Sequence, residues 1–105
     1  MTINKQREGS KLYAEILGRI DTVTVTDAEK ALLPDVEGIT ELTLDFKGLD
    51  YISSAGLRLL LSLQKIMNKQ GTMKVTNVNE TIMEIFEVTG FADILTVENE
   101  PEEEA

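Results

Sequence analysis

The sequence predicts a single α/β domain with one mixed β-sheet of about four to five strands, packed against helices and preceded by a short N-terminal hairpin. Three observations support this fold class. The chain of 105 residues has room for one modest core. Segments that alternate apolar and polar residues are interspersed with segments of helical periodicity. Glycine or proline separates most of these segments, as expected for loops between strands and helices.

The first two extended segments form the predicted hairpin. Thr2–Glu8 and Lys11–Leu17 flank the turn residues Gly9-Ser10, and the second segment alternates apolar and polar side chains as a half-buried strand does. Gly18 is expected to end this second strand.

A helix is predicted after the hairpin, with either Thr24 or Thr26 as its N-cap and acidic residues in its first turn. Ala28 and Leu32 share its apolar face. Pro34 should end this helix, or leave only a short helical turn after it, because proline disfavours helical geometry in the preceding residue.

The middle of the chain predicts a strand, a short extended segment and a long helix. Thr40–Phe46 alternates in hydropathy, and Tyr51-Ile52 is short and extended. Leu57–Lys69 carries a wide apolar stripe at helical spacing, with a polar face opposite and Gly71 as C-cap.

The last third predicts a further strand at Thr72–Val78 and a helix with Asn79 as N-cap and Gly90 as its stop. Ile94–Val97 is expected to be the final short strand. The domain would then span residues 1–97. Residues 98–105, which include five glutamates, would form a solvated acidic tail.

Composition excludes most familiar catalytic sites. The chain has no cysteine and no histidine, so disulfides, thiol nucleophiles, zinc-thiolate sites and a Ser-His-Asp triad are all absent. We therefore expect no cofactor, no metal and no enzymatic activity; paired carboxylates such as Asp21 and Asp45 are the only catalytic alternative.

The net charge of −9 disfavours nucleic acid or an anionic membrane surface as a partner. No apolar run reaches the roughly 18–20 residues of a membrane span, and the N-terminus lacks the apolar stretch of a signal peptide. We expect a cytoplasmic protein, either a monomer or a weak dimer.

The segment Ile52-Ser53-Ser54-Ala55-Gly56-Leu57 places two hydroxyl groups where a strand meets a helix. The first backbone N–H groups of a helix have no intrahelical partner, and the helix dipole makes this end electropositive. A serine there can simply cap the helix, or it can carry a phosphate. The residues alone leave both interpretations open.

The segment Leu42–Leu57, with its Asp50-Tyr51-Ile52-Ser53-Ser54 run, resembles the signature of STAS domains and is most similar to bacterial anti-sigma factor antagonists. Gly18-Arg19-Ile20-Asp21 is similar to an earlier element of that family. Gly71–Val75 and Ile85–Phe91 resemble its later strand and helix.

This resemblance implies a STAS-like fold and a role in transcription regulation by partner switching. In such antagonists, a serine at the start of this helix is phosphorylated by an anti-sigma factor that is a serine kinase, and the kinase binds the ATP. The dephosphorylated antagonist binds that kinase and releases the sigma factor, phosphorylation ends the binding, and a phosphatase resets the switch.

Matching the family motif through Gly56-Leu57 makes Ser54 the expected phosphate acceptor, with Ser53 as the alternative. Ser53 stands where the family usually has aspartate, and Ala55 replaces a second hydroxyl residue. Asp21 and Asp45 are expected near the acceptor, where they either assist it or cap loops. The expected partner contacts are Asp21, Ser53, Ala55, Gly56, Leu57, Arg58, Leu61, Ser62 and Lys65.

A different use of the same fold is the alternative function. The chain would then be an unphosphorylated binding subunit of a transport or signalling assembly.

Overall fold

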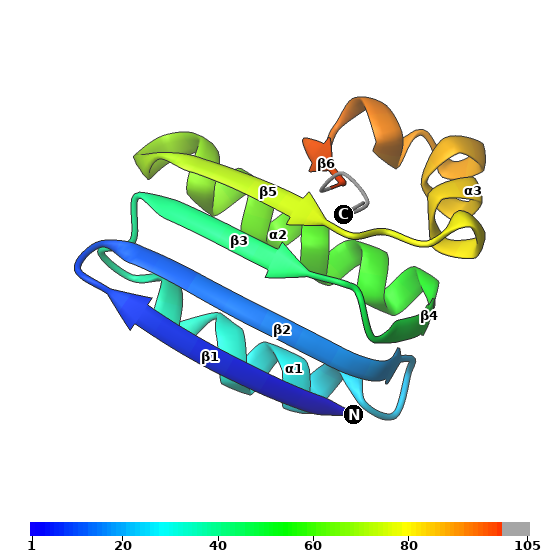
Figure 1. The fold of residues 1–105 in the computed structure, drawn as a ribbon, viewed down its shortest axis with the longest axis horizontal. Helices are drawn as coiled ribbons and strands as arrows, with labels where there is room; N and C mark the ends of the chain where they lie inside the picture. Colours follow the sequence, from blue (N-terminus) through cyan, green and yellow to red (C-terminus); the bar gives the residue numbers. More distant parts are fainter. Residues whose placement is uncertain (100–105) are drawn as a thin grey trace, which may run out of the picture.

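The structure, a computed structural model, describes residues 1–99 and is built on a mixed six-stranded sheet (Figure 1). The strand order is β1-β2-β3-β5-β6, and β4 pairs separately with the end of β2. Only β1 and β2 are antiparallel; every other pairing is parallel. The strands are β1 (Thr2–Glu8), β2 (Lys11–Ile20), β3 (Glu41–Asp45), β4 (Leu49–Ile52), β5 (Thr72–Thr76) and β6 (Val97–Glu98).

This architecture confirms the predicted α/β class, the mixed sheet and the N-terminal hairpin. The sheet has six strands instead of four to five because two of them are very short and pair with few residues. β6 has only two residues, and β4 pairs only with Gly18–Ile20 at the end of β2.

The helices are α1 (Val25–Leu32), α2 (Ser54–Gln70) and α3 (Glu80–Thr89), with single 3₁₀ turns η1 (Pro34–Val36) and η2 (Phe91–Asp93). Figure 1 shows α1 and α2 on one face of the sheet, with α3 near β4 at one end. The apolar side of α2 is buried against the sheet, as its periodicity predicts, and comprises Leu57, Leu59, Leu60, Leu63 and Met67.

Three predicted boundaries are wrong. β2 does not end at Gly18: this residue has a φ of +98° at a register shift, and its N–H donates to the Gly48 carbonyl at 2.9 Å. α2 begins three residues earlier than predicted, at Ser54. The last strand is displaced from Ile94–Val97, because Phe91–Asp93 forms η2 and the strand begins only at Val97.

Other boundaries agree more closely. Thr24 is the N-cap position of α1, as one of the two predictions had it, and Pro34 begins η1 directly after the helix. The predicted strands at residues 40–46 and 72–78 are shorter, Glu41–Asp45 and Thr72–Thr76. Of the acidic tail, Glu98 belongs to β6, and residues 100–105 lie outside the described part of the chain.

Candidate functional site

The two serines at the start of α2 occupy different structural positions. Ser53 is the N-cap, and its side chain accepts a hydrogen bond from the Gly56 N–H at 3.3 Å. Ser54 is the first residue of the helix and is exposed. The structure therefore assigns the capping task to Ser53 and leaves the hydroxyl of Ser54 at the surface.

The parallel pairing of β2 with β4 brings a second loop to this place. Ile20 and Ile52 are register partners at the carboxyl ends of the two strands, and the Ser53 N–H donates to the Ile20 carbonyl at 2.8 Å. Asp21 follows the first strand end and Ser53 follows the second. The turn after β2 and the start of α2 therefore lie next to each other.

Asp21 organises its own turn. Its carboxylate accepts hydrogen bonds from the N–H groups of Val23 and Thr24, both at 2.9 Å, and lies 3.3 Å from the Arg19 Nε. These contacts, with the Thr24 N–H as the largest effect, lower the pKa of Asp21 below its ordinary value. The carboxylate is anionic near neutral pH and fixes the turn beside Ser53.

Asp45 does not point toward the serines but hydrogen-bonds to residues at the ends of β3 and β5 and to Tyr13 of β2. It is only 7% exposed and accepts hydrogen bonds from the Tyr13 hydroxyl, the Lys47 N–H at 2.9 Å and the Asn77 amide at 3.1 Å. Burial by itself raises the pKa of Asp45, but these hydrogen bonds outweigh that effect and leave the pKa lowered. Within residues 1–99, neither Asp21 nor Asp45 hydrogen-bonds to Ser53 or Ser54.

Two of the expected partner contacts are not on the surface. Leu57 is 5% exposed and belongs to the core, because its position in the second half of the first turn faces inward. Gly56 is also buried, and a Cβ there would lie 2.6 Å from Ile52 Cγ1 and 2.9 Å from Ile20 Cγ2. Both residues pack between the first turn of α2 and the core, so the prediction that they contact the partner directly is wrong.

The remaining expected contacts on α2 lie along its outer side. Ser54, Arg58, Leu61 and Lys65 follow one another at spacings of four, three and four residues, which places them on one helical stripe. Ser54, Arg58, Ser62 and Lys65 are exposed, whereas Leu61 and Ala55 are partly buried.

The structure adds three residues that the sequence prediction missed. Val23, in the turn held by Asp21, is 81% exposed. Tyr51 in β4 is 36% exposed, and the Arg19 guanidinium lies 4.7 Å from the centre of its ring. The available signal for Val23 is an apolar residue between two threonines, in a turn where polar residues are the rule.

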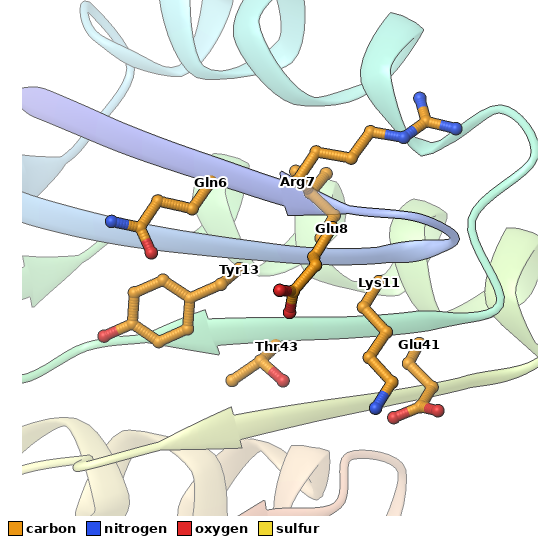
Figure 2. Close-up of a pocket in the computed structure, with 8 residues that line it drawn as sticks. Gln6, Arg7, Glu8, Lys11, Tyr13, Glu41 and Thr43 are labelled. Atoms are coloured by element: carbon orange, nitrogen blue, oxygen red, sulfur yellow. The ribbon is translucent and has the colours of Figure 1, made fainter.

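A cavity of about 480 Å³ lies on the open face of the sheet, where the side chains of Lys11, Tyr13, Glu41 and Thr43 project from the strands (Figure 2). Lys11 and Glu41 begin β2 and β3, so this cavity is at the opposite end of the strands from Ser54.

No trio of acidic residues within residues 1–99 is arranged to hold a metal ion. No helix in this part of the chain has the length and apolar character to cross a membrane. Exposed apolar, aromatic and charged side chains thus occur on the turn after β2, on β4 and on the outer side of α2, the elements that meet near Ser54.

Comparison with known proteins identifies relatives along nearly the whole chain. The model of the STAS domain family matches residues 2–104. The anti-sigma-B factor antagonist of Bacillus subtilis is 31% identical over 101 residues, covering 92% of each chain. The putative anti-sigma factor antagonist BtrV of Bordetella bronchiseptica is 32% identical over 104 residues, covering 97% of this chain and 90% of the relative.

Solved structures share the fold. The anti-sigma factor antagonist SpoIIAA in its unphosphorylated form superposes with a TM-score of 0.82 at 17% identity, covering 98% of this chain and 91% of that one. The phosphorylated form of SpoIIAA from Bacillus gives a TM-score of 0.71 at 18% identity, covering 98% and 95%.

Proposed function

The chain belongs to the STAS domain family, and from this premise we propose that it is an anti-sigma factor antagonist switched by phosphorylation of Ser54. In the unmodified state it binds an anti-sigma factor through the surface around Ser54 and so frees a sigma factor. The anti-sigma factor, acting as a serine kinase with its own ATP, phosphorylates Ser54 and ends the complex. A phosphatase restores binding.

The exposure of Ser54 beside a capping Ser53 is the observation that carries this proposal. A kinase needs a hydroxyl that it can reach, and Ser54 lies on the surface as the first residue of α2. The side chain of Ser53, in contrast, is partly buried, and its Oγ already accepts a hydrogen bond from the Gly56 N–H. The geometry therefore favours Ser54 over Ser53 as the acceptor.

The elements that meet near Ser54 expose the kinds of side chain that protein interfaces use. Val23 and Tyr51 offer apolar and aromatic area, and Arg58 and Lys65 offer charge along the outer side of α2. The two relatives described above carry the name anti-sigma factor antagonist, which supports a binding role over catalysis.

Electrostatics explains how phosphate would end the complex. A phosphoserine adds about −1.5 to −2 charges at one point of the surface. In an interface formed around a neutral hydroxyl, this added charge must be desolvated when the partner docks, which is costly. A penalty of about 3–4 kcal/mol weakens binding by a few hundredfold.

The test combines phosphate mapping with binding. The protein is incubated with ATP and the anti-sigma factor kinase from its own genome, and phosphate is located by mass spectrometry. We expect modification of the wild type and of Ser53→Ala, and none of Ser54→Ala. Titration calorimetry should show that Ser54→Ala binds the kinase like the wild type and that Ser54→Asp binds at least tenfold more weakly.

Phosphate on Ser53 alone would reassign the acceptor. Tight binding by Ser54→Asp would contradict the electrostatic account. A chain that neither binds nor is modified by any such kinase would support the alternative role as an unphosphorylated subunit of another assembly.

A further inference from the structure

We propose that Arg58 is the intramolecular partner of the phosphate on Ser54, so that modification both adds charge at the docking surface and withdraws this arginine from it. This inference rests on the proposed function, since it concerns the phosphorylated state of the same serine. Arg58 would then bind the phosphate in the modified state, in addition to contacting the partner in the unmodified state.

Helix geometry places the two side chains together. Ser54 and Arg58 are both exposed residues of α2 and are four positions apart, a spacing that brings side chains to neighbouring positions on one face. The rise between them along the helix axis is about 6 Å. Helical side chains lean toward the N-terminus, so a long side chain at position 58 extends over the turn that contains Ser54.

Arg58 is also uncommitted. Among residues 1–99, the three salt bridges join Lys5 to Asp35, Arg19 to Asp21 and Lys74 to Glu98, and Arg58 takes part in none of them. Arg19, the other arginine near the site, is occupied by Asp21 and by the ring of Tyr51. A phosphate on Ser54 therefore meets Arg58 without having to displace an existing carboxylate.

The chemistry of the pair is favourable. A guanidinium presents a planar fork of N–H donors that matches two oxygens of a phosphate. The same arrangement is not available to Ser53, because the residue four positions after it is the buried, apolar Leu57. The pairing is thus specific for Ser54.

The second ionisation of the phosphate reports this contact directly. A neighbouring cation favours the dianion and lowers the second pKa of phosphoserine. Phosphoserine is introduced at position 54 during translation by codon suppression, so that no kinase is needed, and its pKa is measured by phosphorus NMR titration. We expect the pKa in the wild-type background to lie about 0.2–0.4 unit below that in Arg58→Gln, the scale of an exposed i,i+4 ion pair.

Lys65→Gln is the matched control, because Lys65 lies on the same exposed stripe and its loss changes the net charge equally. It lies eleven residues from Ser54, about 17 Å along the axis, beyond the screening length of about 8–10 Å at ordinary salt. Its phosphoserine pKa should stay within about 0.1 unit of the wild type. Arg58→Lys should give an intermediate value, because it keeps the charge without the fork.

Equal shifts in Arg58→Gln and Lys65→Gln would overturn the assignment, since they would report only net charge. A larger shift in Arg19→Gln than in Arg58→Gln would overturn it in favour of Arg19. These outcomes are distinct from a failure of the proposed function, because the installed phosphoserine requires neither the kinase nor its complex.

Discussion

Two adjacent serines at the head of α2 illustrate how position separates chemically identical side chains. The Oγ of Ser53 is directed back to the Gly56 N–H, whereas Ser54 starts the helix and faces outward. The side chain of Ser53 is partly buried and already bonded to the backbone, whereas Ser54 is exposed, so a kinase reaches Ser54 more easily.

At the same scale, Val23 is expected to be an apolar anchor for the partner. Burying a valine on complex formation is worth about 1.5 kcal/mol or more, so Val23→Ser should weaken the complex about tenfold. Val88→Ser is the control, because Val88 is similarly exposed (78% against 81% for Val23) but lies on α3 and not on the turn after β2. Titration calorimetry checks this; equal losses in the two variants would contradict a specific anchor.

Asp45 should make stability depend on pH in the acid range. Its pKa in the folded protein lies below the ordinary value of 3.8, so ionised Asp45 contributes stability above that pH and loses it as pH falls through the lowered pKa. Asp45→Asn should cost about 2 kcal/mol at pH 7, because hydrogen bonds to a buried charge are lost. Urea unfolding of both proteins from pH 7 to 2.5 is the measurement.

The difference in unfolding free energy between wild type and Asp45→Asn should be constant above about pH 5 and shrink below about pH 4. A difference that stays constant down to pH 2.5 would show that the carboxylate of Asp45 is not the stabilised form.

The sequence could locate the serines but not the surroundings of Asp45. Ser53, Ser54 and Gly56 stand next to one another in the chain, so their relation to a helix start is a local matter. Tyr13 and Asn77 each lie 32 residues from Asp45, and only the parallel pairing of the strands brings them together. Such contacts depend on which residues of neighbouring strands lie opposite each other, and local hydrophobic periodicity does not predict this register.

At the scale of elements, caps and periodicity predicted most helices and strands. Asn79 and Gly90 delimit α3 as expected, because a side-chain cap and a left-handed glycine are local signals. The continuation of β2 past Gly18 was not predictable in this way. It depends on a bulge and on the pairing of Gly18–Ile20 with β4, a strand about thirty residues later.

The packing of α2 against the ends of β2 and β4 requires a glycine at position 56. In Gly56→Ala, the added Cβ would lie 2.6 Å from Ile52 Cγ1 and 2.9 Å from Ile20 Cγ2, both in buried side chains. Overpacking of this kind costs about 1–3 kcal/mol, against about 1 kcal/mol gained in helix propensity. We expect a net loss of up to about 2 kcal/mol in urea unfolding.

Ala55→Gly is a useful comparison for Gly56→Ala, because it reverses the propensity change at the adjacent, partly buried position. It should cost no more than about 1 kcal/mol. If Gly56→Ala instead stabilised the protein, the close approach of α2 to the two isoleucines would not constrain this residue.

At the scale of the whole molecule, the core and the switch occupy separate places. The apolar core lies between the sheet and the helices that cover one of its faces (Figure 1). Ser54 lies at the carboxyl edge of β4, where β2 also ends, and within residues 1–99 its hydroxyl makes no hydrogen bond that the fold would lose. A charge added at Ser54 should therefore weaken the binding of a partner protein more than it disturbs the packing of the core.

The fold should therefore be insensitive to the modification that controls binding. Phosphoserine or glutamate at position 54 lies at the electropositive end of α2, where a negative charge is favourable, so the melting temperature should stay within about 3 °C of the wild type. Hydrogen exchange should show unchanged protection in β3 and β5, with differences confined to the first turn of α2. A melting temperature lowered by 8 °C or more, with exchange increased in the central strands, would mean that phosphate ends the complex by loosening the domain and not by its charge at the interface.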